Sequence, residues 1–468
     1  MRTVAQQRLP RPVREQAGAA TDARTTIRER PGTCATDDVG VRRPRAAARY
    51  SRSASDMWVG PGPRRVRSTT MVRDLADFPR PVLAALAAAE RLLTRRYGAS
   101  VVLADPEDLG GSDRSVVARA RVARNPFSMR RSVVVKHYVA EPDVDRPDPF
   151  HFEVASCQLF TALPADSRPS PVIIAHDPQA RLLVLEDLGR SSTLADKLFG
   201  PDPAAARRYL VGWARALGRM QAATAGREND FGALLRRLGE KAWRDPIADE
   251  ARAAIAGVPE LLQSVLGVTT TAAAQAQAHE TARLLGGTRY RAFSPSDTCP
   301  DNNLVTSRGV RFVDFEWGCF RDVALDAAYF RVPFPGCRAS FAMPDGMSEA
   351  MLEAWRDEIA VVWPDLDDPL RLDRRLLDAQ LLWVWLCTWW FLPRIRERDT
   401  SVGPETGRSP RISTALCDYW HRLSAAAAEA EGLGATVELA ESITAALRAR
   451  FSDAPAALPL YPAFRGTV

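Results

Sequence analysis

The chain has 468 residues, with 63 Lys and Arg against 57 Asp and Glu, which gives a formal net charge of +6. A hydrophobic content of 46% and a charged content of 26% are ordinary for globular proteins, and they exclude a wholly disordered chain, a collagen-like fibre and a protein with many membrane spans. The seven cysteines are scattered and form no CxxC pair or metal-type spacing, so we expect no disulfide framework and a cytoplasmic location.

The first 70 residues differ in charge from the rest of the chain. They hold 15 Arg, no Lys and six acidic residues, a local net charge of +9, so the remaining residues sum to −3. With few apolar residues, this segment cannot offset its ordering entropy by burial, and we expect residues 1–72 to form a disordered Arg-rich tail. Its Arg clusters have the charge to meet a phosphate backbone or an anionic membrane, but no DNA-binding motif accompanies them, so no specific nucleic-acid partner is predicted. A misassigned start, with Met71 as the true first residue, is the alternative.

Between residues 81 and 187, short apolar segments alternate with turns. Alternating side chains and β-branched residues predict an antiparallel sheet, and two helical stripes predict one helix before it and one within it. The expected strands are 100–103, 115–122, 132–138, 172–176 and 182–186, and the expected helices are 81–97 and 149–163.

After Gly189 the pattern changes to helices, which continue to about residue 451 and are interrupted by a short hairpin over residues 303–313. The apolar run 381–392 contains four Trp but ends at Pro393 after too few residues to span a bilayer, so a buried core helix and no membrane span are predicted. The fold class predicted is therefore α+β, with a small sheet-based lobe at residues 73–187 and a larger, mostly helical lobe at residues 188–468.

Lysine is rare in this Arg-rich chain, where 60 Arg stand beside only Lys136, Lys197 and Lys241. Lys136 ends the apolar strand segment 133–135, where an unpaired charge is costly, so it needs a partner such as Glu153 on the next helix. The alternative is an ordinary solvated lysine at the end of a strand.

Asp297, Asn302 and Asp314 have a spacing that suits phosphoryl transfer. Asn302 follows Asp297 by five positions, and a hairpin then delivers Asp314. One carboxylate can deprotonate an attacking hydroxyl, while an amide oxygen and a second carboxylate hold Mg²⁺ on the phosphates. Oxygen ligands without His or Cys favour Mg²⁺ over zinc. The alternative for each residue is a turn, a cap or a surface position.

A glycine-rich segment, Gly110-Gly111-Ser112, lies between the first two expected strands. Without a Cβ at the glycines, backbone N–H groups can approach a triphosphate closely. The segment is not a Walker A motif because no Gly-Lys-Ser or Gly-Lys-Thr follows, and an ordinary hairpin is the alternative.

In the order of its motifs, the chain resembles the aminoglycoside phosphotransferase and choline kinase-like family. These motifs are, in order, the glycine-rich hairpin, the strand Lys, the helix Glu, the linker segment 185–189, the Asp-x4-Asn segment and the final Asp. The resemblance covers about residues 80–335 and implies the two-lobed protein-kinase-like fold. Membership of the protein kinases themselves is not favoured, because no HRD, DFG or APE triplet is present.

The resemblance implies a phosphotransferase that uses ATP and Mg²⁺ and transfers the γ-phosphate to a hydroxyl of a small molecule, such as an aminoglycoside, choline or a sugar. It implies that Asp297 is the catalytic base and that Asp322 and Asp326 brace the metal-binding loop. The implied nucleotide-binding residues are Gly110, Gly111, Ser112, Lys136, Glu153, Glu186 and Leu188, and the implied Mg²⁺ ligands are Asn302 and Asp314.

Two of the departures from the family pattern lie close to the predicted catalytic and metal-binding residues. Pro295 stands where the family often has His, two positions before the catalytic Asp, and Glu316 stands where Gly often follows the metal-binding Asp-Phe pair. The absence of the histidine's support for the loop motivates a second hypothesis, a catalytically weak kinase-fold protein that binds nucleotide or serves as a scaffold.

Overall fold

The computed structural model describes residues 78–124, 131–141, 147–243, 245–403 and 409–466. The expected disordered tail over residues 1–72 and the alternative start at Met71 lie outside these residues. In the part of the chain that is described, no helix is long and apolar enough to cross a membrane.

A five-stranded antiparallel sheet follows the first described helix, α2 (Arg80–Tyr97). Its spatial order is β1-β2-β3-β5-β4. The strands are β1 (Val102–Ser112), β2 (Ser115–Arg124), β3 (Ser132–Tyr138), β4 (Ile173–Asp177) and β5 (Leu182–Glu186).

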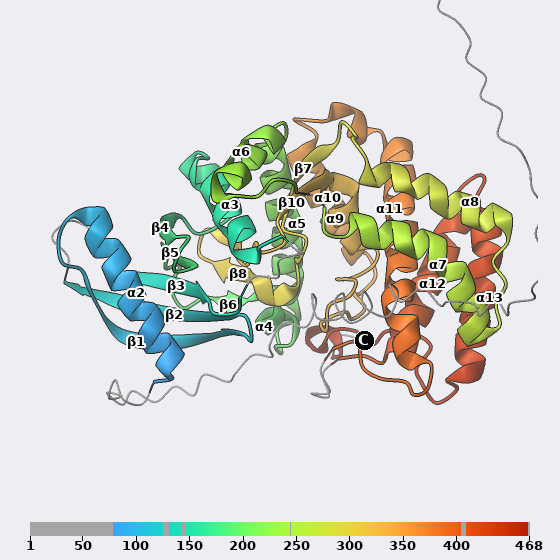
Figure 1. The fold of residues 1–468 in the computed structure, drawn as a ribbon. Coiled ribbons are helices and arrows are strands. Elements are labelled where there is room, and N and C mark those ends of the chain that lie inside the picture. Colours follow the sequence, from blue (N-terminus) through green and yellow to red (C-terminus); the bar gives the residue numbers. More distant parts are fainter. Residues whose placement is uncertain (1–77, 125–130, 142–146, 244, 404–408, 467–468) are drawn as a thin grey trace, which may run out of the picture. The chain divides into compact units, whose positions relative to one another are not determined.

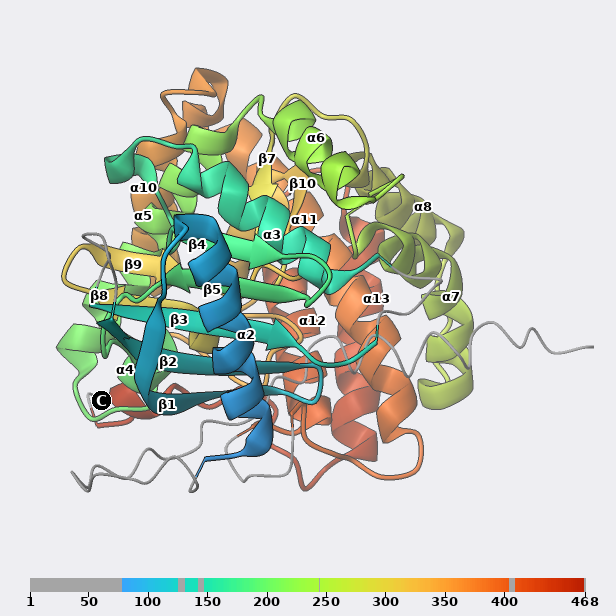
Figure 2. The same cartoon turned by 60° about the vertical axis from the view of Figure 1, so that its left-hand side comes forward.

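Helix α2 lies across one face of this sheet (Figures 1 and 2). Leu86 and Leu93 of α2 form an apolar core with Ala118, Val133 and Val135 of the strands. Because side chains alternate along a strand, the residues between these point to the opposite face, where Val134 packs against the larger core of the helical part. Lys136 therefore faces the helical part of the chain.

The β1–β2 hairpin differs from the sequence prediction. The expected first strand ends at residue 103, but β1 continues through Gly110 and Gly111, and only Asp113 and Arg114 form the turn. Both glycines have positive φ angles, 97° and 138°, and a Cβ on Gly111 would lie 2.1 Å from the Ser115 carbonyl oxygen. Glycine thus lets the paired strands continue, with shifts of register, where the sequence suggested a loop.

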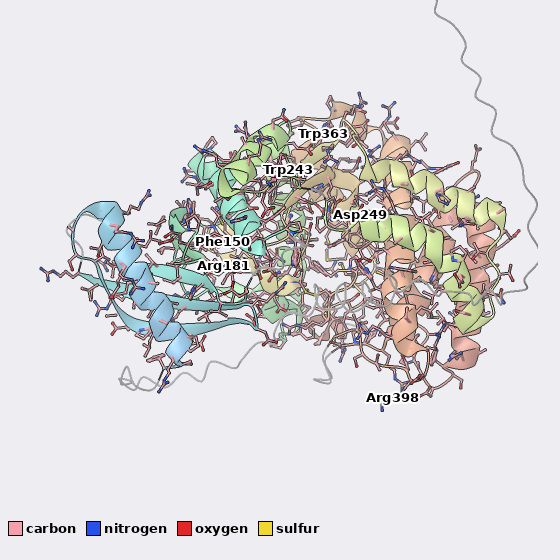
Figure 3. The ribbon with its side chains drawn as sticks, viewed as in Figure 1. Phe150, Arg181, Trp243, Asp249, Trp363 and Arg398 are labelled. Carbon is pink, nitrogen blue, oxygen red and sulfur yellow. A yellow bond between two sulfur atoms is a disulfide. The ribbon has the colours of Figure 1, made fainter. Side chains whose placement is uncertain are left out.

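Helix α3 (Pro149–Thr161) packs on the other side of the sheet and begins at a well-formed cap. The Asp148 carboxylate accepts a hydrogen bond from the Phe150 N–H at 3.0 Å, and Pro149 occupies the first turn. Arg181 pairs with Asp148 and lies over the Phe150 ring. Figure 3 labels Arg181 and Phe150 next to each other. This contact fixes the start of the helix that carries Glu153.

The remainder of the described chain is mostly helical. Helix α11 is its centre, and Trp383 and Trp385 are almost fully buried there, which confirms the predicted core helix in the apolar run. The helices are α4 (Leu194–Leu198), α5 (Pro203–Thr224), α6 (Glu228–Leu238), α7 (Ala248–Leu266), α8 (Ala272–Thr281), α9 (Val323–Ala327), α10 (Met347–Ile359), α11 (Pro369–Phe391), α12 (Ile412–Ala428) and α13 (Gly434–Arg450).

Two small sheets lie among these helices. The predicted hairpin is present as β8 (Asn303–Thr306) and β9 (Gly309–Phe312), joined by β6 (Ser192–Thr193). A second antiparallel pair joins β7 (Arg291–Ser294) to β10 (Cys319–Asp322), and the sequence analysis missed it because four-residue strands show too little alternation. A small antiparallel sheet followed by a larger helical part confirms the predicted α+β fold class.

Candidate functional site

Lys136 at the end of β3 is almost fully buried and binds two carboxylates. Its Nζ donates to Glu153 Oε2 at 3.1 Å and to Asp314 Oδ1 at 2.6 Å, across 178 positions of the chain. Burial lowers the pKa of Lys136, but the two carboxylates outweigh burial and raise this pKa well above its ordinary value. The ammonium therefore stays charged, as an anion-binding group must.

Asp314 directly follows the β8–β9 hairpin and holds an uncommon backbone conformation. Its φ is 67°, in the left-handed region that few residues other than glycine adopt. The preceding Val313 N–H donates to the Asn302 carbonyl at 3.0 Å, so Asp314 lies beside the loop that contains Asn302. Its side chain is 40% exposed, which leaves the carboxylate accessible to a ligand.

The loop after β7 carries Asp297 and is closed by hydrogen bonds within itself. Asp297 Oδ1 accepts from the Cys299 N–H at 3.0 Å, and Asn302 Nδ2 donates to the Asp297 carbonyl at 3.4 Å. Asn303 Nδ2 donates to the Cys299 carbonyl at 2.7 Å. Burial raises the pKa of Asp297 to about 7, against the opposing effect of the Cys299 N–H.

The short β7–β10 pair brings the two loops together. Ser294 at the end of β7 pairs with Cys319 at the start of β10. The loop that contains Asp297 therefore begins at one strand of this pair, and the segment after Asp314 leads into the other strand. Below the ladder, the buried Asp326 carboxylate accepts from Ser294 Oγ at 2.8 Å and from Arg321 Nε at 3.0 Å. Asp326 thus contacts the strand that leads to Asp297.

Asp322 also holds structure in this region. Its carboxylate caps α9 through the Ala324 N–H at 3.0 Å and pairs with Arg375 of α11. Its Oδ2 also accepts from Thr288 Oγ1 at 2.6 Å, so one side chain joins three segments of the helical part.

Glu316 connects this loop to the glycine-rich hairpin. Arg114, in the turn after Ser112, donates to Glu316 Oε1 at 2.7 Å, and its guanidinium lies 5.5 Å from the centre of the Trp317 ring. Burial and the nearby Asp314 charge raise the pKa of Glu316 to about 7. The hairpin that carries Gly110, Gly111 and Ser112 is therefore held next to the Asp314 segment, and Arg114 is a site residue that the sequence analysis missed.

The linker after β5 is held by polar contacts to the sheet. Asp187 accepts from Arg119 Nε at 3.0 Å and from Ser132 Oγ at 2.7 Å, and Arg119 Nη2 donates to the Gly189 carbonyl at 2.7 Å. The Glu186 side chain accepts from the Val172 N–H at 3.2 Å. Glu186 and Leu188 therefore lie in a segment whose backbone is held in place by side chains of the sheet.

A divalent cation suits the oxygen donors of Asn302 and Asp314. Asn302 uses its Nδ2 within the loop, which leaves its amide oxygen available as a ligand atom. Among the described residues, no group of three or more His, Cys, Asp or Glu side chains could hold a metal by itself. Mg²⁺ commonly takes one or two protein oxygens and completes its shell with substrate phosphates and water, so this small donor set fits Mg²⁺.

A disulfide between Cys299 and Cys337 corrects one expectation from the sequence. The two residues are 38 positions apart, and their Cα atoms lie 5.9 Å apart. Scattered cysteines gave no sign of this bond, because the tertiary fold alone brings residue 337 to the Asp297 loop. The four other cysteines in the described part of the chain, at positions 157, 319, 387 and 417, are free and buried.

A cavity of about 380 Å³ lies at another place. Its lining residues include Phe199, Phe341, Pro459 and Arg465, and none of the predicted site residues is among them. It is formed against the C-terminal segment, so it is separate from the cluster around Lys136.

Comparison with known proteins gives structural matches only. No family model and no curated protein sequence matches the chain. It is similar to a choline/ethanolamine kinase family protein from Mesorhizobium loti, with 15% identity, a TM-score of 0.41, and coverage of 76% of this chain and 97% of that one. It is also similar to the choline kinase LicA from Streptococcus pneumoniae, with 13% identity, a TM-score of 0.36, and coverage of 76% and 99%.

A third match is a thermostable mutant of an aminoglycoside phosphotransferase, with 13% identity, a TM-score of 0.35, and coverage of 77% of this chain and 99% of that one. The names of these three proteins describe kinases or phosphotransferases.

Proposed function

We propose that the chain is a phosphotransferase that uses ATP and Mg²⁺ and transfers the γ-phosphate of ATP to a hydroxyl of a small molecule. One observation carries this proposal. A buried, charged lysine on the sheet binds Asp314, which lies beside the loop containing Asn302 and Asp297. A cation for phosphates, oxygen ligands for a metal and a carboxylate for a hydroxyl proton are what in-line phosphoryl transfer requires of a protein.

In this proposal the sheet-based lobe, residues 73–187, binds the nucleotide. Lys136 binds the α- and β-phosphates and Glu153 holds its ammonium in place. The backbone of Gly110, Gly111 and Ser112 covers the phosphates, and the backbone at Glu186–Leu188 holds the adenine. Arg114 supports this arrangement because it ties the hairpin to Glu316.

The helical lobe, residues 188–468, supplies the chemistry. Asn302 and Asp314 hold Mg²⁺, which neutralises charge on the phosphates. Asp297 accepts the proton of the acceptor hydroxyl as its oxygen bonds to the γ-phosphorus and the bond to the β–γ bridging oxygen breaks. A base works best when its pKa lies near the working pH, which the partly buried position of Asp297 favours.

A transfer assay with matched variants tests the proposal. Wild-type protein, screened with ATP and Mg²⁺ against hydroxyl-bearing metabolites and antibiotics, is expected to consume ATP with at least one acceptor. Asp297→Asn should abolish transfer while retaining nucleotide binding, and Asp314→Ala should remove the Mg²⁺-ATP shift in melting temperature. Asp357→Asn, an exposed change on α10, serves as the control. No melting shift in either wild type or Asp314→Ala would reject the proposal.

The second candidate is a nucleotide-binding protein with weak catalysis or a scaffolding role. Pro295 favours it, because proline has no side-chain donor with which to support the loop from the position two residues before Asp297. A melting shift with Mg²⁺-ATP that survives Asp297→Asn, without transfer to any acceptor, would favour this candidate. Robust transfer abolished by Asp297→Asn would reject it.

A further inference from the structure

The Asp297 loop is joined to residues 337 and 338 by two neighbouring links. The first is the Cys299–Cys337 disulfide. The second is an ion pair, in which Arg338 donates to Asp301 Oδ2 through Nη2 and through Nε at 3.2 Å. A covalent bond and a charged pair thus reach positions 299 and 301 from two consecutive residues.

The backbone of Cys299 contacts both Asp297, the proposed base, and Asn302, a proposed metal ligand. Its N–H donates to the Asp297 carboxylate at 3.0 Å, and its carbonyl accepts from the Asn302 N–H at 2.8 Å. Holding the Cys299 backbone therefore sets the place of the proposed base and of a proposed metal ligand together. Pro295 offers no side-chain donor for this purpose.

The segment that carries Cys337 and Arg338 is itself firmly held by the C-terminal part of the chain. The buried Tyr461 donates from its hydroxyl to the Ala339 carbonyl, and the buried Tyr419 shares a hydrogen bond with Ser340. The Ala342 N–H donates to the Pro459 carbonyl at 2.9 Å. Gly403 approaches so closely that a Cβ on it would lie 2.3 Å from Arg338 Cβ.

These contacts form one continuous support that runs from the C-terminal segment through residues 337–342 to the Asp297 loop. A loop held by hydrogen bonds alone shifts between positions more readily than one held by a covalent bond, whereas a proposed base must stay within a fraction of an ångström of its working position. A link to a rigid, buried segment supplies this restraint.

We propose that Cys299, Cys337 and Arg338 are positioning residues for the Asp297 loop, and that reduction of the disulfide loosens the loop and lowers turnover. This inference rests on the proposed function. A dithiol is the reductant: its two thiols supply two electrons and two protons, the S–S bond breaks to give two cysteine thiols, and the dithiol becomes a cyclic disulfide. The ion pair of Arg338 with Asp301 remains after reduction.

The first test measures the loop without any need for turnover. Hydrogen exchange of the peptide spanning residues 295–303 is compared in wild type, in wild type reduced with dithiothreitol, and in Cys299→Ser/Cys337→Ser. Exchange is expected to rise about tenfold in the last two samples, because the covalent restraint on the loop is lost. Dithiothreitol should have no effect on the double variant, and Cys417→Ser, which changes a free buried cysteine on α12, should match wild type.

The second test separates positioning from general stability. With an acceptor that wild type phosphorylates, kcat of the reduced protein and of the double variant is expected to fall about tenfold, while KM for ATP stays within about twofold. Arg338→Met should lower kcat similarly, and Arg338→Lys should restore part of it. Melting temperatures are recorded so that kcat refers to folded protein.

The outcomes distinguish this inference from the proposed function. Unchanged loop exchange after reduction, or a loss of activity that only follows the loss of folded protein, overturns the inference. If oxidised wild type transfers no phosphate and binds no Mg²⁺-ATP, but loop exchange still rises on reduction, the restraint is supported and the proposed function is rejected.

Discussion

Two antiparallel arrangements in this chain are stabilised in different ways. The five-stranded sheet is stabilised by an apolar core, in which Leu86 and Leu93 of α2 cover alternate residues of the strands. The β7–β10 pair has only four residues a strand, and a buried polar cluster centred on Asp326 supports it. Phe293 and Phe320 of the small pair also join the large apolar core. The comparison indicates that the larger sheet tolerates exchanges of apolar volume, whereas the small pair, which places Asp297, depends in addition on individual polar atoms.

The largest effect is expected where the five-stranded sheet contacts the segment that leads into β10. Lys136→Met removes the cation that binds Asp314 and Glu153, so phosphate transfer should fall by roughly 10²- to 10³-fold. It also leaves Glu153 buried without a cation, at a cost of about 3 kcal/mol in the free energy of unfolding.

The double variant Lys136→Met/Glu153→Gln is the control for this change. It should recover part of the stability in urea unfolding and none of the transfer. Transfer by Lys136→Met at the wild-type rate would show that the lysine has only a structural role.

Two buried changes of similar cost test the comparison directly. Leu93→Ala in α2 and Asp326→Ala below β7 should each lower the free energy of unfolding by about 3 kcal/mol. Only Asp326→Ala should also lower kcat, by about tenfold, because Ser294 then loses its acceptor and the loop to Asp297 shifts. Equal kcat values for the two variants, measured well below their melting temperatures, would contradict the distinction.

Neighbouring glycines of the β1–β2 hairpin form a matched pair. Gly111→Ala places a Cβ against the Ser115 carbonyl and should cost about 2 kcal/mol, while Gly110→Ala meets open space and should cost about 1 kcal/mol for its positive φ. Urea unfolding gives both values. KM for ATP should rise more for Gly111→Ala than for Gly110→Ala. A larger rise for Gly110→Ala would indicate that another segment covers the phosphates.

The smallest effect is expected for Arg114→Gln. The ion pair with Glu316 is partly exposed, so its loss should change the free energy of unfolding by less than about 1 kcal/mol. KM for ATP should nevertheless rise about threefold, because the hairpin is no longer tied to the Asp314 segment. Arg95→Gln, which breaks the exposed pair with Asp177, is the control and should leave KM unchanged.

Local pattern was sufficient for most of the longer regular elements. The strand over residues 132–138 and the helix that contains the apolar run 381–392 were predicted from their residues alone, because alternation and continuous apolarity reflect burial directly. The first strand was predicted too short, since the polar residues between 104 and 108 and the two glycines have the appearance of a loop. Pairing with β2 outweighs that local preference.

The candidate site was predictable in its residue types and not in its connections. Asp297, Asn302, Asp314, Lys136 and Glu153 were identified from spacing and resemblance, and the structure brings Lys136, Glu153 and Asp314 into direct contact. Arg114 and Glu316 are 202 positions apart, and nothing in either local segment indicates their pairing. The catalytic roles of the five residues identified from the sequence stay a prediction, which the transfer assay tests.

The amino-acid sequence by itself determined the longer helices, most strands of the five-stranded sheet and the side chains proposed for the chemistry, because these depend on the period of apolar residues and on the reactivity of each side chain. Only the tertiary structure decided that Cys299 meets Cys337, that Arg338 meets Asp301 and that Asp326 supports Ser294. Such contacts join segments through single atoms across long stretches of chain, and no periodic pattern records them.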